Sequence, residues 1–249
     1  KSVTSRQLAE LMVGSELPSP STHASTVTDR PVLAITGLSL AGAGVRDVLH
    51  DITLTIHAGE VLGIAGVEGN GQAELVEAIM GMREPSAGRI FLEDKDISDW
   101  HTREIREAGV AYIPEDRHRH ALLLDAPLWE NTMLGHQTER PNVKGVWIDG
   151  TGAKAEAEQI LADYDVRTPS IYVTANSLSG GNQQKLIIGR EMSYTPRVLV
   201  AAHPTRGVDV GAQAAIWDHI RRARREGLAV LLISADLDEL IGLSDTIRV

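Results

Sequence analysis

The run from Gly66 to Ala73 has the residue types of a phosphate-binding loop, because it follows an apolar segment, 61–65, and opens a helix-like one. A glycine-rich turn between a strand and a helix lets backbone N–H groups close on a phosphate at the positive end of the helix dipole. The spacing matches GxxxxGK(S/T), except that Gln72 stands at the lysine position and Ala73 at the Ser/Thr position. Tight packing of the turn requires the same glycines, so both readings stay open for this segment. The candidate nucleotide-binding residues are Gly66, Gly69, Asn70, Gly71, Gln72 and Ala73.

A second glycine run, LSGGNQQK at 178–185, opens another helix-like segment. Ser179 offers a hydroxyl, and Gly180 and Gly181 offer unobstructed backbone N–H groups, so an anion can bind at this helix start. An ordinary N-cap is the alternative reading. Two further short motifs are IPEDR, which contains Glu115, and PTRGVDVGA, which contains Asp209.

The elements that must position these motifs alternate along the chain from residue 61 onward. Short runs rich in Val and Ile predict strands, and longer amphipathic stretches predict helices, so we expect an α/β domain with a largely parallel sheet. Before it, the segment 33–56 ends in a strict apolar–polar alternation that predicts antiparallel strands. The predicted strands are 61–65, 110–113, 198–202 and 229–234, and the predicted helices are 72–82, 151–164, 180–191 and 213–225.

Length and composition set the outer bounds. The 249 residues suit one large domain with an appendage. We expect a helix at 1–14, a linker rich in Pro, Ser and Thr at 15–31, and a main domain at 32–249. With 34 acidic against 24 basic residues, the net charge is −10, which disfavours a nucleic-acid partner. The lack of cysteine excludes disulfides and thiolate chemistry, and the longest apolar runs are far shorter than the ~20 residues of a membrane span.

These segments, in this order, resemble the ATP-binding proteins of ABC transporters, whose signature LSGGNQQK matches closely. More narrowly, IPEDR, LSGGNQQK, PTRGVDVGA and GVEGNGQAEL are similar to the second nucleotide-binding domain of the tandem ATPases that serve sugar and nucleoside importers. The resemblance covers about 32–249. It implies a P-loop NTPase fold of the ABC ATPase type: α/β, with a mostly parallel core sheet, an antiparallel β subdomain and a helical insertion at about 98–177. It also implies that 1–14 is the last helix of a preceding domain and that the C-terminal strand is truncated.

The same resemblance assigns roles to single residues. It implies Glu115 in the Q-loop, Asp209 in the D-loop, and Ser179, Gly180, Gly181 and Gln183 in the signature. The family's catalytic positions hold other residues here: Ala202 and His203 replace an acidic pair, and Ala235 replaces a histidine. Phosphoryl transfer needs charge neutralisation, bound Mg²⁺ and an oriented nucleophile. The missing Lys charge alone is worth at most about 4 kcal/mol near a phosphate. We therefore expect no intact catalytic residues and no metal site in this chain.

In the family, two domains face each other head to tail, and each ATP lies between the phosphate loop of one and the signature of the other. The resemblance then implies that this chain supplies its signature in trans to a competent first domain. Its own loop would be inert or would hold nucleotide without turnover. The implied cofactor is ATP, with Mg²⁺ only at the partner domain's site. The implied partners are a first nucleotide-binding domain of the same polypeptide, membrane permease subunits and, indirectly, an extracytoplasmic solute-binding protein, which places the domain at the cytoplasmic face of the membrane.

Two rival functions remain beside an importer for nucleosides or simple sugars. An ABC-like structural or interaction module that no longer binds nucleotide is the main alternative. A soluble ABC ATPase of DNA repair or translation is disfavoured by the acidic balance. Smaller features read as ordinary structure: 118–120 as a solvated loop, and the arginines at 221–225 as a helix C-terminus. The apolar residues 122–124 with Trp129 fit either a core or a permease contact.

Overall fold

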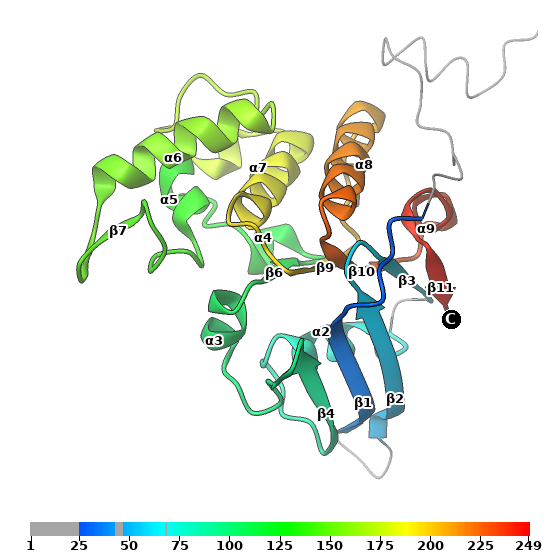
Figure 1. Ribbon diagram of the computed structural model, residues 1–249. Coiled ribbons are helices and arrows are strands. Elements are labelled where there is room, and N and C mark those ends of the chain that lie inside the picture. The colour runs from blue at the N-terminus through cyan, green and yellow to red at the C-terminus, as the bar shows by residue number, and fades with distance from the viewer. Residues whose placement is uncertain (1–24, 43–46, 68) are drawn as a thin grey trace, which may run out of the picture.

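The structure, a computed structural model, describes residues 25–42, 47–67 and 69–249. Two larger sheets, a two-stranded sheet and a group of helices make up the described part, with the larger antiparallel sheet at one end and the helical group at the other (Figure 1). The expected helix at 1–14 and most of the expected linker lie outside the described residues. The linker's last residues are bonded to the domain, because Thr28 N–H donates to Ala58 O at 3.0 Å and Thr26 Oγ1 donates to Gly59 O at 2.8 Å.

The central sheet is parallel, as predicted, and its order is β11-β3-β10-β9-β6. Its two middle strands, β9 and β10, are buried along their whole length, which explains their continuous apolar sequences. All four predicted strands occur within this sheet. The strands are β3 (Val61–Ala65), β6 (Val110–Ile113), β9 (Val198–Ala202), β10 (Ala229–Ser234) and β11 (Thr246–Arg248).

The antiparallel sheet has the order β2-β1-β4-β5, and it confirms the antiparallel strands predicted at 33–56. Ile35 pairs with Leu54 on one side and with Ile90 on the other, so the central strand of the three is β1. Its buried side chains pack with those of α2 (Gln72–Ile79) in one hydrophobic cluster. The strands are β1 (Pro31–Ala41), β2 (Asp47–His57), β4 (Ala87–Leu92) and β5 (Lys95–Asp96).

The helical group lies beyond the β6 edge of the parallel sheet (Figure 1). The expected insertion at 98–177 is wrong at its start, because β6 lies inside that range and pairs in parallel with β9. A strand buried in the core sheet cannot belong to an inserted subdomain, so the insertion begins after Glu115. Its elements are α4 (Arg117–His120), α5 (Leu128–Met133), β7 (Val143–Lys144), β8 (Trp147–Ile148), α6 (Gly150–Asp163) and the 3-10 turn η1 (Ala175–Ser177), whereas α3 (Thr102–Glu107) precedes β6.

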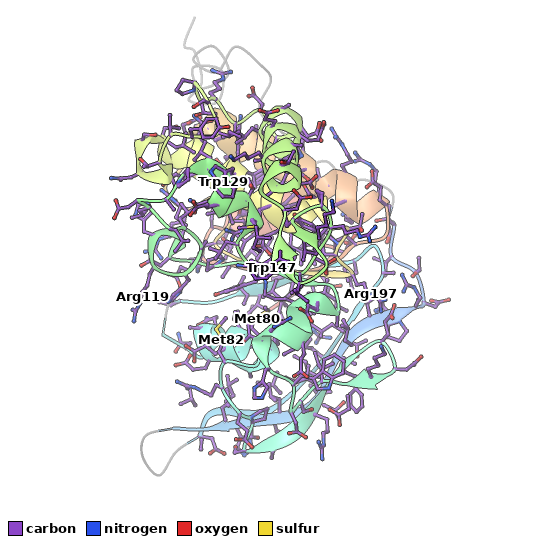
Figure 2. All side chains as sticks on the ribbon, turned by 90° about the vertical axis from the view of Figure 1, so that its left-hand side faces the viewer. Met80, Met82, Arg119, Trp129, Trp147 and Arg197 are labelled. Carbon is purple, nitrogen blue, oxygen red and sulfur yellow. The ribbon has the colours of Figure 1, made fainter. Side chains whose placement is uncertain are left out.

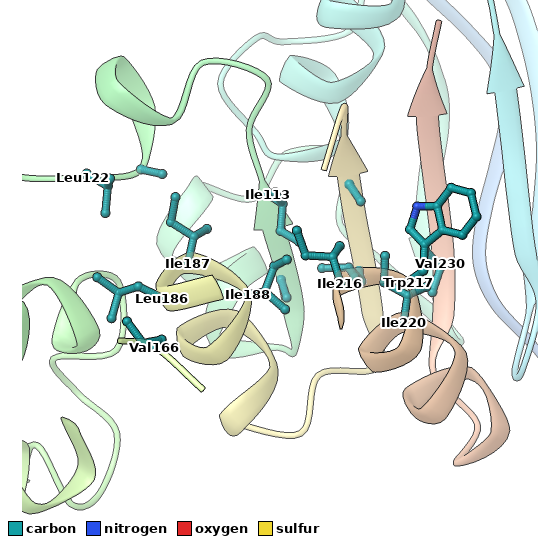
Figure 3. Packing of buried hydrophobic residues seen from close by; sticks show 14 of the residues in the cluster. Ile113, Leu122, Val166, Leu186, Ile187, Ile188, Ile216, Trp217, Ile220 and Val230 are labelled. Carbon is teal, nitrogen blue, oxygen red and sulfur yellow. The ribbon is translucent and has the colours of Figure 1, made fainter. Parts of the chain in front are cut away.

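Three further helices are α7 (Gly180–Ser193), α8 (Val210–Arg225) and α9 (Leu237–Leu243). Of these, α7 contacts α5 and α6 of the helical group as well as β6 and α8, whereas α9 packs on β3 and β10. Figure 3 shows Ile187 and Ile188 of α7 between Leu122 of the insertion and Ile113 of β6, while Ile216 and Ile220 of α8 lie beside Val230. One continuous hydrophobic cluster therefore joins the insertion to the parallel sheet. Two predicted helices differ from the observed ones by three residues at one end, and the other two differ by one or two. α2 ends at Ile79 instead of 82, because Gly81 follows with φ +65°, and α8 begins at Val210 instead of 213, where Asp209 caps it. Among the described residues, no helix is long and apolar enough to cross a bilayer.

Candidate functional site

The glycine-rich turn connects β3 to the first residue of α2, as the sequence predicts. Gly69 and Gly71 have φ values of +89° and +98°, a backbone conformation that only glycine adopts without strain. A Cβ at Gly71 would also lie 2.7 Å from Leu49 Cδ2, in the antiparallel sheet. Packing therefore accounts for Gly71, whereas a Cβ at Gly69 would meet no atom within 4 Å.

The side chain of Gln72 closes this loop on itself. Its Oε1 accepts from Asn70 N–H at 3.1 Å, and its Nε2 donates to Val67 O at 3.2 Å. The Asn70 amide donates to the same Val67 carbonyl at 3.0 Å. A Cβ at Gly66 would overlap Gln72 Nε2, so the amide lies directly against the turn. One backbone N–H of the turn, that of Asn70, is thus already bonded to a side chain.

A cavity of about 210 Å³ adjoins the loop and collects residues from four segments of the chain. Carboxylates of Glu77, Glu115 and Asp116 line it, and among the described residues in its wall none is Lys or Arg. Burial, together with the charges of Glu77 and Glu115, raises the pKa of Tyr112 to about 12, so the Tyr112 hydroxyl stays protonated at neutral pH. Two of these carboxylates are paired with arginines, Glu77 with Arg83 at 3.2 Å and Glu115 with Arg206, so Asp116 is the one carboxylate of this wall for which no ion pair is described.

The three positions at which other residues replace the family's catalytic side chains lie at the carboxyl ends of β9 and β10. Ala202 and His203 line the cavity, and His203 has φ +50° with its N–H donating to Ile233 O at 2.8 Å. Ala235 is exposed just beyond β10. Neither Ala73 nor Ala202 carries a side-chain oxygen, so these two positions supply no side-chain ligand for a divalent cation.

The signature residues lie at the start of α7. Ser179 is exposed and caps the helix, because its Oγ accepts from the backbone N–H of Asn182 at 3.4 Å; the side-chain Nδ2 of Asn182 donates to the same oxygen at 3.1 Å. A Cβ at Gly181 would lie 3.1 Å from Asp209 Oδ2, so the signature adjoins the predicted D-loop residue. Asp209 itself caps α8 by accepting from Ala212 N–H at 2.9 Å. The structure brings Ser179, Gly180, Gly181 and Asp209 together.

Gln183 differs from the other three signature residues, because its side chain is buried within this chain. Its Nε2 donates to Ala175 O at 3.0 Å, and its Oε1 accepts from Arg117 Nε at 3.2 Å. His118 Nε2 lies 2.9 Å from the same oxygen. Gln183 therefore supports the segment that leads into Ser179 instead of facing outward.

Glu115 lies at the end of β6 and forms an ion pair with Arg206, in the turn that precedes Asp209. Sequence reasoning missed Arg117, which contacts two distant segments, although this arginine stands in the IPEDR motif that carried the resemblance. It also missed Glu239 of α9, which is buried and accepts from Thr205 Oγ1 at 2.8 Å. Burial raises the pKa of Glu239, and no sequence pattern marks it.

Three minor sequence readings change in the structure. His118 belongs to the one-turn helix α4 instead of a loop. Arg221 and Arg224 do more than end a helix, because they are largely buried and Arg224 forms an ion pair with Asp245 at 3.3 Å. Leu122 is core, whereas Leu123 is half exposed. Among the described residues, no three His, Cys, Asp or Glu side chains are placed to hold a metal ion.

Sequence comparison matches this chain to ATP-binding proteins of ABC transporters. A profile of the family described as ABC transporter matches residues 49–206. The chain is 44% identical over 244 residues to the guanosine import ATP-binding protein NupO of Bacillus subtilis, covering 98% of this chain and 48% of that protein. It is 41% identical over 246 residues to the nucleoside import ATP-binding protein NupA of Lactococcus lactis, covering 99% and 49%. The chain thus spans about half the length of these curated relatives.

Structural comparison confirms the expected fold. A nucleotide-free ATP-binding cassette from an ABC transporter superposes with a TM-score of 0.73 at 23% identity, covering 87% of this chain and 86% of that one. The dimeric structure of a bacterial ABC transporter cassette gives a TM-score of 0.73 at 19% identity, covering 86% and 92%. Both are α/β cassettes with the parallel sheet and antiparallel subdomain described above.

Proposed function

Because this chain belongs to the ABC transporter family of ATP-binding proteins, we propose that it is the second nucleotide-binding domain of an importer ATPase. In this proposal its own phosphate loop is degenerate, and its main role is to present the signature in trans to a competent first domain. The relatives it matches are nucleoside and sugar import ATP-binding proteins about twice as long as this chain, which leaves room for such a first domain.

The contrast between the two glycine motifs carries this proposal. Ser179 is exposed at the start of α7, and the adjoining glycines leave backbone N–H groups unobstructed by side chains. The loop at 66–73 is instead closed by Gln72 and borders a cavity with three carboxylates. One motif thus leaves backbone donors open to an anion, whereas in the other Gln72 already accepts from a backbone N–H of the turn.

The proposal assigns one role to the signature and Asp209 and another to the glycine-rich turn. Ser179 and the first N–H groups of α7 would contact the phosphates of a nucleotide held by the first domain, and Asp209 would approach the same site. ATP bound there, with Mg²⁺ supplied at that site alone, provides the chemistry. Gly66, Gly69, Asn70, Gly71 and Ala73 form a second site that turns over no nucleotide, since Ala202, His203 and Ala235 offer neither a magnesium ligand nor the family's catalytic side chains.

The transported solute and the other partners are inferred from the relatives. NupO and NupA are named for guanosine and nucleoside import, and a glucose import protein of Haloferax volcanii is 41% identical over 249 residues. We therefore propose nucleosides or simple sugars as the solute class. Permease subunits, with a solute-binding protein outside the membrane, would complete the assembly, and the domain would work at the cytoplasmic face of the membrane.

Ser179→Arg in the assembled transporter tests the trans role. Because Ser179 is exposed, a long side chain there would block the partner's nucleotide without entering this chain's core. We expect ATP turnover to fall to the background rate, measured as phosphate release. The matched control is Ser86→Arg, an exposed serine just before β4 in the antiparallel subdomain, which should keep wild-type turnover.

Wild-type turnover in Ser179→Arg would reject the trans role. Gly180→Asp should also abolish turnover, but a Cβ at Gly180 would lie 2.8 Å from Arg117 Nη2 and 2.9 Å from Gly207 O. This second variant disturbs the chain itself, so its thermal unfolding has to be compared with wild type before its loss of activity is assigned to the signature.

The second candidate function is a structural module that no longer binds nucleotide. The hydrogen bonds of Gln72 to Asn70 N–H and Val67 O favour it, because they occupy the loop at which this chain itself would bind a phosphate. A titration of the assembled protein with ATP distinguishes the two candidate functions. Nucleotide binding that Ser179→Arg weakens supports the trans role. No detectable ATP or ADP binding, even with the first domain present, supports the structural module. Hydrolysis by this chain alone, well above a Ser179→Arg variant and a blank, would show that the chain is catalytically competent.

A further inference from the structure

We propose that Arg117 is a positioning residue that fastens the start of α7 to the turn ahead of Asp209, so that signature and D-loop act as one rigid unit. The inference rests on the trans role of the signature proposed above. It concerns a residue to which neither the sequence motifs nor the relatives assign a task. Arg117 follows the Q-loop position Glu115 by two residues and begins α4.

The guanidinium of Arg117 reaches two different parts of the chain. Its Nη1 donates to Arg206 O at 2.8 Å, and Nη2 faces Gly207 O at 3.5 Å. Its Nε donates to Gln183 Oε1 at 3.2 Å, on the first turn of α7. The partners are 89 and 66 residues away in sequence, so only the folded chain brings them together.

Gln183 connects Arg117 to the segment that leads into the signature. Its Nε2 donates to Ala175 O at 3.0 Å, and Ala175 opens the turn that leads into Ser179. Because Gln183 is buried, its amide has no water to replace a lost partner, which makes the orientation of the side chain depend on Arg117 and His118. Arg117 thus acts on the signature through Gln183.

Gly180 of the signature also packs against Arg117 and the turn at 206–207. A Cβ on Gly180 would lie 2.8 Å from Arg117 Nη2 and 2.9 Å from Gly207 O, so the signature glycine lies directly against both. A second connection runs parallel to the first, because Glu115 pairs with Arg206. Two side chains that follow β6 therefore contact the turn at 206–207, and one of them also holds the signature helix.

An arginine suits this place better than a lysine. The planar guanidinium presents several N–H donors in fixed directions, so one side chain satisfies acceptors on two segments at once. A lysine ammonium is a point charge that can reach one of these acceptors but does not impose their relative direction. Loss of the guanidinium would let the signature shift relative to Asp209, and small misplacements of groups around a reacting phosphate lower the rate strongly.

The test compares Arg117→Ala with Arg119→Ala in the assembled transporter. Arg119 is an exposed arginine of the same one-turn helix and supplies the matched control (Figure 2). We expect Arg117→Ala to lower kcat for ATP hydrolysis about tenfold or more while KM for ATP stays within about twofold, since the nucleotide is bound by the partner's loop. Arg117→Lys should restore part of kcat, and Arg119→Ala should match wild type.

A distance measurement separates positioning from a general loss of structure. The chain has no cysteine, so spin labels can be attached at Ala155→Cys on α6 and Leu237→Cys on α9, both exposed. We expect Arg117→Ala to broaden the distribution of the distance between the labels, with thermal unfolding still cooperative. A wild-type kcat, a lower kcat without broadening, or an equal effect of Arg119→Ala would each overturn the proposal.

Failure of this proposal is distinguishable from failure of the trans role. If Ser179→Arg keeps wild-type turnover, the signature is not used and the trans role fails. If Ser179→Arg abolishes turnover while Arg117→Ala leaves kcat and the distance distribution unchanged, only the positioning role of Arg117 fails.

Discussion

At the scale of single residues, the replacement of lysine by Gln72 has two effects instead of one. The sequence shows the loss of a positive charge, whereas the structure adds that the amide occupies the loop, accepting from Asn70 N–H and donating to Val67 O. A phosphate must therefore displace a neutral side chain that already satisfies the turn. The two effects predict different results for two substitutions at this position.

Gln72→Ala removes the amide and adds no charge, and Gln72→Lys removes it and restores the charge. We expect Gln72→Ala to tighten ATP binding to this chain slightly and Gln72→Lys to tighten it by a further factor of ten or more, up to a limit of about 4 kcal/mol. Isothermal titration with ATP measures both. Gln159→Ala, an exposed glutamine on α6, is the control, and equal affinities for all four proteins would contradict the closure by Gln72.

His136 gives the protein a pH-dependent stability. Burial lowers its pKa to about 4, and Nε2 lies 3.3 Å from Arg106 Nη2, as a neutral ring accepting a hydrogen bond would. Since the pKa is lower in the folded state than the usual 6.5, the unfolded chain binds the proton more tightly between these values. Stability is therefore present above pH 6.5 and is lost as the pH falls toward 4, by on the order of 3 kcal/mol.

The variant His136→Gln tests this source of pH dependence. Glutamine keeps an acceptor for Arg106 and does not titrate, so the free energy of unfolding should change less between pH 6.5 and 4 than in wild type. Urea denaturation at several pH values measures the difference. The exposed His50 provides the control His50→Gln, which should follow the wild-type curve. An unchanged slope in His136→Gln would assign the effect to other groups.

At the scale of elements, α7 connects the functional motif to the core. Its first turn carries the signature, and its last turn carries Glu191, which is fully buried. Glu191 accepts from Tyr112 N–H of β6 at 3.1 Å and pairs with Arg106 of α3 at 3.0 Å and with Arg190 at 2.9 Å. Burial by itself would raise the pKa of Glu191, but Arg190 and Arg106 outweigh it and hold the pKa below its usual value.

Removing this carboxylate should release α7 from β6. Glu191→Ala leaves two largely buried arginines unpaired, which costs about 3–5 kcal/mol of folding free energy. Chemical denaturation is the measurement, and Glu158→Ala, an exposed glutamate on α6, should stay within about 0.5 kcal/mol of wild type. A loss of less than about 1 kcal/mol for Glu191→Ala would show that hydrophobic packing alone positions α7.

At the scale of the whole molecule, the chain carries two candidate sites, which differ in the chemical groups that they expose. The carboxyl ends of β3, β6, β9 and β10 meet at one edge of the parallel sheet and surround an acidic cavity. The signature and Asp209 lie together at the starts of α7 and α8. The insertion adds an exposed apolar tip, Val146 to Ile148, on the β7–β8 hairpin, where Figure 2 labels Trp147.

Turnover by the assembled transporter should reflect this asymmetry. We expect Gln72→Ala to change the steady-state ATPase rate by less than about twofold, because this loop drives no hydrolysis in the proposed scheme, whereas Ser179→Arg abolishes the rate. Phosphate release under saturating ATP measures both variants. A large loss in Gln72→Ala would place catalysis at this chain's own loop and would overturn the assignment of the degenerate half.

Much of the fold could be predicted from local patterns. The four predicted strands of the parallel sheet are short, apolar and bounded by turns, and all four occur at the predicted residues. The range 98–177 for the insertion, which came from the resemblance, overlaps the strand predicted at 110–113, and the pairing of that strand with 198–201 places it in the core sheet. The end of α2 was missed, since the helix stops where Gly81 turns against Trp100 and Ile105.

The sequence alone determined which functional groups stand at the positions that carry the family resemblance, because charge and functional groups belong to residue types: a neutral amide at Gln72, methyl groups at Ala73, Ala202 and Ala235, an imidazole at His203, and the Ser179, Gly180 and Gly181 of the signature. The tertiary structure alone decided how these groups are held. The closure of the loop by Gln72, the burial of Gln183 and the reach of Arg117 to Arg206 all depend on distances between side chains and carbonyls. Such distances are set by packing between segments far apart in sequence, which residue types and spacing do not encode.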